Sequence, residues 1–258
     1  MKKWIGVLTV VLLSGCVVPQ STEGSSGVAN SIADSESRQR ARAFTDLAGA
    51  YFNRAQYKIA LDELRKAITA DNQFGPAYNI YGLIYMELAE DKLAEDNFRR
   101  AIELDRGDSE ARNNFGWFLC TRSRYDEGLE QFSTAIRNPL YAKPEQAMAN
   151  AGLCAEKKGD LALAETNLLK SLKLQPDNPF TLLKMAGLNY RQNKLVETQR
   201  LLARHAEVAP PTAESLWLGV QVERRLGDRA QEAAYGLQLR KRFPDSSEAR
   251  LLLTGQYE

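Results

Sequence analysis

Three cysteines and one histidine are the side chains of this sequence best suited to act as nucleophiles, metal ligands or redox groups. They are Cys16, Cys120, Cys154 and His205. The cysteine spacing matches no zinc motif, and no glycine-rich loop precedes a helix as it would in a phosphate-binding site. The chemistry open to this sequence is therefore that of thiols, namely acylation, disulfide formation or burial as small apolar groups.

Cys16 follows a segment with the features of a secretory signal. Two lysines precede the apolar run "WIGVLTVVLL" (4–13), which is too short to span a bilayer, since a helix needs about 20 residues for that. A charged start, a short apolar run and small residues predict a signal peptide over residues 1–15. The stretch "LSGC" (13–16) resembles the bacterial lipobox and predicts lipidation of Cys16. The alternative is an ordinary signal followed by a chance cysteine.

A lipidated Cys16 predicts permanent membrane attachment. Each buried methylene contributes about 0.8 kcal/mol, so a triacylated cysteine, with palmitate as its third chain, stays bound. In Gram-negative lipoproteins an aspartate after this cysteine commonly signals inner-membrane retention. Val17 stands there instead, so we expect sorting to the periplasmic face of the outer membrane. Residues 16–40 are rich in small and polar side chains and are expected to form a flexible tether.

The composition indicates a soluble, near-neutral body. Hydrophobic residues make up 44% and charged residues 26% of the chain. Loss of the two signal lysines changes the formal charge from +1 to −1, which gives no field to attract nucleic acid. We expect membrane contact through the lipid alone, and no small-molecule substrate, cofactor or metal. The only histidine, His205, falls at a helix-packing position, and the sequence carries no catalytic constellation, so an enzyme is not expected.

A 34-residue period organises the rest of the chain. Apolar residues recur at positions 4, 7, 8 and 11 and again at 20, 24 and 27, which gives one buried face on each of two helices per repeat. This is the tetratricopeptide pattern, and it predicts an all-α, right-handed superhelical solenoid of about six repeats. The expected repeats are 41–74, 75–108, 109–142, 145–178, 179–212 and 213–246, with a capping helix at 247–258.

The last two repeats depart from the pattern. Repeat five has Asn189 at position 11 and His205 at position 27. Repeat six has Glu223 at position 11 and Glu232 at position 20, which indicates either a one-residue slip or a capping role. Terminal repeats need a polar outer face for solubility, and the weaker match at this end suits that need.

The concave side of such a solenoid is lined by the first helices, chiefly through positions 2, 5, 9, 12 and 13. In repeats one to three these positions predict an apolar strip beside asparagines that can hydrogen-bond a peptide backbone. The alternative is that Trp117 and its neighbours pack between repeats. The cations of a carboxylate clamp are missing, so an amphipathic helix or an extended apolar segment is the expected ligand. The predicted groove residues are Phe52, Asn53, Asn79, Leu83, Met86, Asn113 and Trp117.

Cys120 and Cys154 both fall in first helices, which run side by side in a stack. A disulfide across the junction between repeats three and four is therefore reasonable if the two Cα atoms lie within about 7 Å. Two separately buried thiols are the alternative.

Three stretches go beyond the repeat consensus: "AYNIYGLIYMEL" (77–88), "SEARNNFGWFLC" (109–120) and "LYAKPEQAMANAGLCAEKKGDLALAE" (140–165). With the lipobox and six repeats, they resemble the PilF/PilW family of type IV pilus biogenesis lipoproteins. This resemblance implies a pilotin, which helps the secretin of the pilus to localise and multimerise, and hence a part in twitching motility. A lipoprotein of another envelope system, for β-barrel insertion or peptidoglycan-synthase activation, is the alternative.

Overall fold

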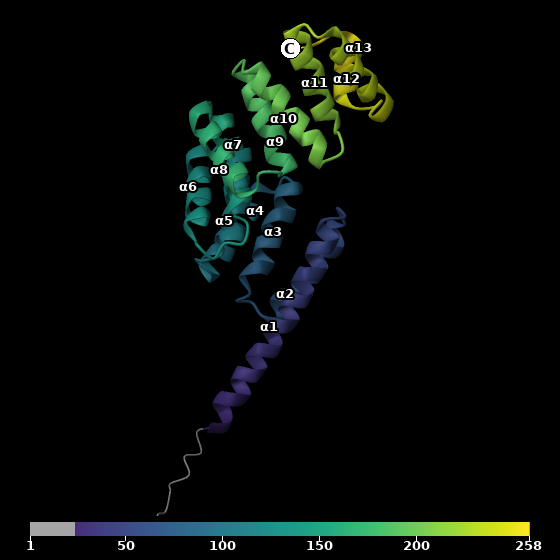
Figure 1. Cartoon of the computed structure of the whole chain (residues 1–258). Helices are drawn as coiled ribbons and strands as arrows, with labels where there is room; N and C mark the ends of the chain where they lie inside the picture. Colours follow the sequence, from purple (N-terminus) through teal and green to yellow (C-terminus); the bar gives the residue numbers. More distant parts are fainter. Residues whose placement is uncertain (1–23, 258) are drawn as a thin grey trace, which may run out of the picture.

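The computed structural model describes the backbone of residues 24–257 and the side chains of residues 36–257. The expected signal peptide (1–15) and the expected lipidation site Cys16 lie outside the described residues. Within the described part the chain forms thirteen helices and no strand. Successive antiparallel pairs stack into a curved array (Figure 1), which confirms the all-α repeat solenoid.

Each expected repeat holds one helix pair, and α13 (Ser247–Thr254) follows the last pair. The pairs are α1 (Gly24–Phe52) with α2 (Tyr57–Ala70), α3 (Gly75–Glu87) with α4 (Asp91–Leu104), α5 (Ser109–Thr121) with α6 (Tyr125–Arg137), α7 (Pro144–Lys158) with α8 (Leu161–Leu174), α9 (Pro179–Arg191) with α10 (Leu195–Val208), and α11 (Ala213–Leu226) with α12 (Arg229–Arg242).

In every repeat, the last residue of the turn between the two helices has the left-handed backbone conformation. Gly159 and Gly227 take this conformation, with φ of 92° and 83°. The aspartate after each glycine then caps the second helix, because its carboxylate accepts a backbone N–H of the first turn. In the other four repeats the same position carries a side chain in the left-handed region, at Ala55, Ala89, Ser123 and Asn193.

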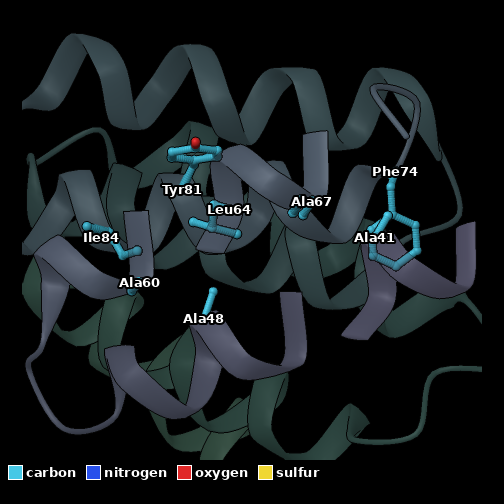
Figure 2. Packing of buried hydrophobic residues seen from close by; sticks show 9 residues of the cluster. Ala41, Ala48, Ala60, Leu64, Ala67, Phe74, Tyr81 and Ile84 are labelled. Atoms are coloured by element: carbon cyan, nitrogen blue, oxygen red, sulfur yellow. The ribbon is translucent and has the colours of Figure 1, made fainter. Parts of the chain in front are cut away.

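Close approach of the two helices depends on small residues at position 8. A Cβ on Gly82 would lie 2.6 Å from the ring of Phe98, and one on Gly152 would lie 2.8 Å from Leu168. The large side chain at position 24 thus fills the space that the glycine leaves. In repeat one an alanine does the same, and Ala48 lies beside Leu64 in the first core cluster (Figure 2).

Repeat six keeps the helix bounds but moves its close contact by one residue. A Cβ on Gly219, at position 7, would lie 2.8 Å from the ring of Tyr235. Glu223 is buried and accepts two hydrogen bonds from the Gln199 amide, at 3.0 and 3.2 Å. Glu232 pairs with two arginines at 2.8 and 2.7 Å. The polar residues at positions 11 and 20 are therefore satisfied by neighbouring polar groups rather than packed as core.

The helix α1 begins at Gly24, so the expectation of a flexible tether reaching to residue 40 is wrong for residues 24–40. Packing explains why the turns of α1 nearest to the stack are helical. Ala41 is fully buried, and Arg38 pairs with Asp71 at 3.0 Å and lies 6.0 Å from the Phe74 ring centroid. Adding turns to a helix that is already nucleated costs little. The beginning of α1 projects away from the stack (Figure 1). None of the described helices combines the length and apolar character needed to cross a membrane.

Candidate peptide-binding groove

A cavity of about 600 Å³ opens on the concave side of the solenoid, and we refer to it as the concave groove. All of its lining residues come from the first helices of repeats three to six. They are Asn113, Asn114, Trp117, Gln146, Asn150, Leu153, Glu156, Lys157, Phe180, Leu183, Lys184, Gly187, Arg191 and Glu214. The groove therefore begins at repeat three and extends toward the C-terminal repeats.

Two aromatic side chains give the concave groove its apolar surface, and each has a lysine over its ring. The ammonium of Lys157 lies 5.9 Å from the Trp117 ring centroid, and that of Lys184 lies 5.6 Å from the Phe180 ring centroid. Phe180 is 47% exposed. An exposed apolar ring of this kind can be covered by a binding partner. The two rings can thus accept an apolar side chain, while Lys157 is exposed beside Trp117 and Lys184 is half-buried beside Phe180.

The charges of the groove are partly neutralised. Lys184 pairs with Glu214 at 2.7 Å, and Arg191 pairs with Glu156. Burial lowers the pKa of the Arg191 guanidinium, and the carboxylate of Glu214 opposes that shift. Lys157 forms no ion pair within the described residues. The groove therefore keeps one ammonium group that a ligand carboxylate can meet.

A chain of four asparagine side chains crosses the first helices of repeats two, three and four. Asn114 donates to Asn79 Oδ1 at 3.1 Å, Asn113 donates to Asn114 Oδ1 at 3.4 Å, and Asn150 donates to Asn113 Oδ1 at 3.0 Å. Asn79 and Asn113 are buried, whereas Asn114 and Asn150 are half-buried and line the groove. An amide side chain carries both a donor and an acceptor, so these two can bond the backbone of an extended segment.

The disulfide between Cys120 and Cys154 lies behind this surface. It joins α5 to α7, with Cα atoms 5.6 Å apart across a sequence separation of 34 residues. Trp117 packs against the cluster that contains both cysteines. The bridge therefore fixes the two helices that hold Trp117 and three of the four asparagines.

Of the seven residues predicted for the groove, the structure brings only Asn113 and Trp117 to the cavity. Asn79 is buried beneath Asn114. Leu83 and Met86 pack half-buried against the core cluster that includes Phe98. Leu83 and Met86 therefore do not line the concave groove, because the large rings of α4 and α5 draw them toward the junction between repeats. The continuous apolar strip along repeats one to three stays a prediction at these positions.

The other two predicted residues lie at the end of α1. Phe52 packs on the first core cluster, with its ring centroid 6.0 Å from that of Tyr57. Asn53 is exposed in the turn that follows. Most of the groove residues that were missed occupy the same class of positions, namely 2, 5, 9, 12 and 13, but in later repeats, as Leu153, Phe180 and Leu183 show. Reading those positions in repeats four to six would have found these residues. Asn114, Asn150 and Lys184 fall instead at position 6, which the sequence analysis did not assign to the concave side.

The remaining candidate for chemistry, His205, is buried in α10 with 4% exposure. Burial lowers the pKa of its imidazole, and Glu214 acts in the opposite direction. Among the described residues no group of three or more histidines, cysteines or acids is placed to hold a metal ion. The arrangement of this face is suited to binding a polypeptide, with amide groups, aromatic rings and a few charges.

Comparisons with known proteins agree with this description of the fold. The tetratricopeptide repeat family profile matches residues 75–108 and 145–178. The chain is 31% identical over 242 residues to the type IV pilus assembly protein PilF of Pseudomonas aeruginosa, and the match covers 93% of each protein.

Two solved structures are similar over most of the chain. The structure of Pseudomonas aeruginosa PilF has a TM-score of 0.74 and 29% identity, and covers 86% of this chain and 99% of that one. The structure of PilW, described as a widely conserved type IV pilus biogenesis factor, has a TM-score of 0.75 and 30% identity, and covers 83% and 98%. The similarity therefore extends across the whole repeat array.

Proposed function

The chain belongs to the PilF/PilW family of tetratricopeptide-repeat proteins in type IV pilus biogenesis, and we propose that it serves there as a pilotin. In this role it is an adaptor without catalytic activity, which binds the pilus secretin and promotes its localisation and multimerisation. The observation that carries the proposal is the concave groove, because its exposed side chains are suited to holding a polypeptide.

The groove favours an extended segment over an amphipathic helix. A helix satisfies its own backbone N–H and C=O groups, so it gains nothing from Asn114 and Asn150. An extended segment presents unpaired backbone groups to those amides and can direct alternate side chains toward Trp117 and Phe180. We therefore propose that an extended secretin segment lies along the first helices of repeats three to five.

We further propose that the protein acts from the periplasmic face of the outer membrane. Support comes from the sequence: the lipobox at residues 13–16 and Val17 in place of a retention aspartate. A lipid anchor on Cys16 would hold the solenoid near the membrane into which the secretin inserts. Fractionation checks this part, since substitution of Cys16 with serine should release the protein from outer-membrane vesicles.

The decisive experiment uses a strain that lacks the gene and is complemented with variants. The unsubstituted chain should restore secretin multimers on non-denaturing gels together with surface pili. The Trp117→Ser variant should restore less than a tenth of the multimers at equal protein level. As a matched control, Tyr78→Ser removes an aromatic ring from repeat two, where it lies 5.9 Å from Arg100 and outside the groove, and should restore more multimers than Trp117→Ser.

Three outcomes would contradict the proposal or a part of it. Normal secretin multimers in the gene-deletion strain would show that the protein is not a pilotin. Full activity of Trp117→Ser would leave the pilotin role standing but would exclude the concave groove as the binding site. Envelope defects in place of pilus loss would point to another assembly system.

A further inference from the structure

The concave surface of repeat six is already occupied by a side chain of the same protein. Residues 255–257 follow α13 and turn back toward α11, and in Figure 1 the marked chain end lies beside that helix. Gly255 makes the reversal with φ of 69°, and the N–H of Gln256 donates to the carbonyl of Leu251 at 3.1 Å. These two features place Tyr257 against α11.

Three residues of α11 contact Tyr257, and we call them the aromatic slot: Trp217, Gln221 and Arg224. The ring of Tyr257 stacks on Trp217 with centroids 5.6 Å apart and planes inclined by 18°. The Arg224 guanidinium carbon lies 3.8 Å from the Tyr257 ring centroid. Gln221 donates from Nε2 to the backbone carbonyl of Tyr257 at 3.0 Å. Stacking, cation–π contact and a backbone hydrogen bond thus converge on one residue.

The positions of these three residues show that the slot belongs to the binding side of the solenoid. Trp217, Gln221 and Arg224 occupy positions 5, 9 and 12 of repeat six. The same classes of position supply Trp117, Leu153 and Leu183 to the concave groove. The slot is therefore the repeat-six counterpart of the surface that lines the groove in earlier repeats.

Nothing in these contacts is specific to this segment of the chain. They use an aromatic ring and a main-chain carbonyl, which any extended segment with an aromatic residue offers. The hydroxyl of Tyr257 makes no hydrogen bond within residues 36–257, so phenylalanine or tryptophan would fit the same contacts. All three contacts to the slot come from Tyr257. A free segment with an aromatic residue can therefore replace Tyr257 there.

We propose that the aromatic slot is a second peptide-binding site, whose external ligand is an extended polypeptide segment bearing an exposed aromatic residue. Tyr257 fills the slot as a tethered competitor until that ligand displaces it. A short tether holds its ligand at an effective concentration on the order of millimolar. An external segment therefore needs either a higher affinity or a second contact, which the neighbouring concave groove can supply.

The test is a titration of the full chain, labelled with ¹⁵N, in which the indole N–H resonance of Trp217 is followed. The probe is a synthetic pentapeptide, Thr-Gly-Gln-Tyr-Glu, which reproduces residues 254–258. In the Tyr257→Ala variant the slot is vacant, and the peptide should shift the resonance with at least tenfold higher affinity than in the unsubstituted chain. The same peptide with alanine in place of tyrosine should cause no shift.

Matched variants separate occupancy of the slot from general effects. Tyr257→Phe keeps the slot filled and should bind the peptide as weakly as the unsubstituted chain. Tyr78→Ala removes another surface ring that lies 5.9 Å from an arginine, in repeat two, and should not open the slot. Adding Gln221→Ala to Tyr257→Ala should weaken peptide binding, since the carbonyl of the peptide loses its donor.

Either of two results would overturn the proposal. One is equal affinity of the Tyr257→Ala variant and the unsubstituted chain for the peptide, with both folded by circular dichroism. The other is equal binding of the alanine-containing peptide, which would show that the aromatic ring is not recognised. Both measurements are independent of the secretin and therefore of the proposed pilotin role.

Discussion

The concave face differs between repeats one and two and repeats three to five, although both regions have the same helix pairing. In the first region Phe52, Leu83 and Met86 are half-buried, pack against core clusters and do not line the cavity. In the second region Trp117 and Phe180 stand at a cavity of about 600 Å³. The repeat pattern alone does not distinguish these two outcomes.

Side-chain size at the junctions accounts for the difference. The junction between repeats two and three holds three phenylalanines, with ring centroids 5.8 to 6.2 Å apart, and neighbouring apolar side chains pack onto them. The buried part of the junction between repeats three and four consists of alanines, Phe132 and the disulfide, with half-buried Tyr125 and Tyr141 packed on it. With fewer buried rings to pack on, Trp117 stays half-buried at the groove. Four predictions test this contrast, in descending order of expected effect.

Loss of the disulfide should have the largest effect, because it removes the covalent link within the open region. Replacing Cys120 and Cys154 by alanine should lower the free energy of unfolding by about 4 kcal/mol, the amount expected for a loop of 34 residues. Urea denaturation measures this change. The unsubstituted chain without reductant should show no free thiol at either position when it is labelled in denaturant, and full labelling of both would exclude the bridge.

Two single variants, Leu83→Ser and Trp117→Ser, should affect stability and binding differently, because one lies in each region. Leu83→Ser takes an apolar side chain from a core junction and should cost about 2 kcal/mol of folding free energy. Trp117→Ser should cost less stability but weaken binding of an extended secretin segment, the ligand proposed above, at least tenfold. Urea denaturation and a binding titration of both variants check the pair. Equal binding losses at equal stability would show that the concave surface is continuous across both regions.

The residues with positive φ in the turns inside the repeats allow a further comparison, with a smaller expected effect on stability. Gly159→Ala, in repeat four, forces a side chain into φ of 92° and should cost about 1 kcal/mol. Ala89→Gly, in repeat two, removes that strain at φ of 58° but adds chain entropy, so a gain of about 0.5 kcal/mol is expected. Thermal unfolding of both variants should give shifts of opposite sign. Shifts of the same sign would mean that the turns are not equivalent.

The pH dependence of His205 should be the smallest effect. Its folded pKa lies below the usual value because of burial, so the unfolded chain binds the proton more readily. Stability is therefore full above the unfolded pKa of about 6.5 and falls as the pH drops below it toward the folded pKa. The variant His205→Gln should lack this part of the dependence between pH 7 and 5, measured by urea denaturation. An unchanged profile would show that the imidazole titrates normally.

Sequence reasoning succeeded where neighbouring helices repeat the same contact. The spacing of Gly82 and Phe98, and of Gly152 and Leu168, placed helix pairs that the structure contains. It also brought Cys120 and Cys154 within bridging reach, because a 34-residue separation puts two residues at nearly equivalent positions on adjacent first helices. It failed for residues 24–40 of the expected tether, which continue the first helix. Arg38 and the adjoining Ala41 hold that helix by packing on α2 and the turn that follows it.

The sequence by itself determined the solenoid and its family, since both follow from a local period and from stretches that can be read residue by residue. Only the tertiary structure decided which concave positions are open. Whether Trp117 faces a groove or Leu83 enters a core depends on the summed size of side chains from three or more helices. The seating of Tyr257 on Trp217 also depends on a chain reversal after α13 that brings together residues 40 positions apart.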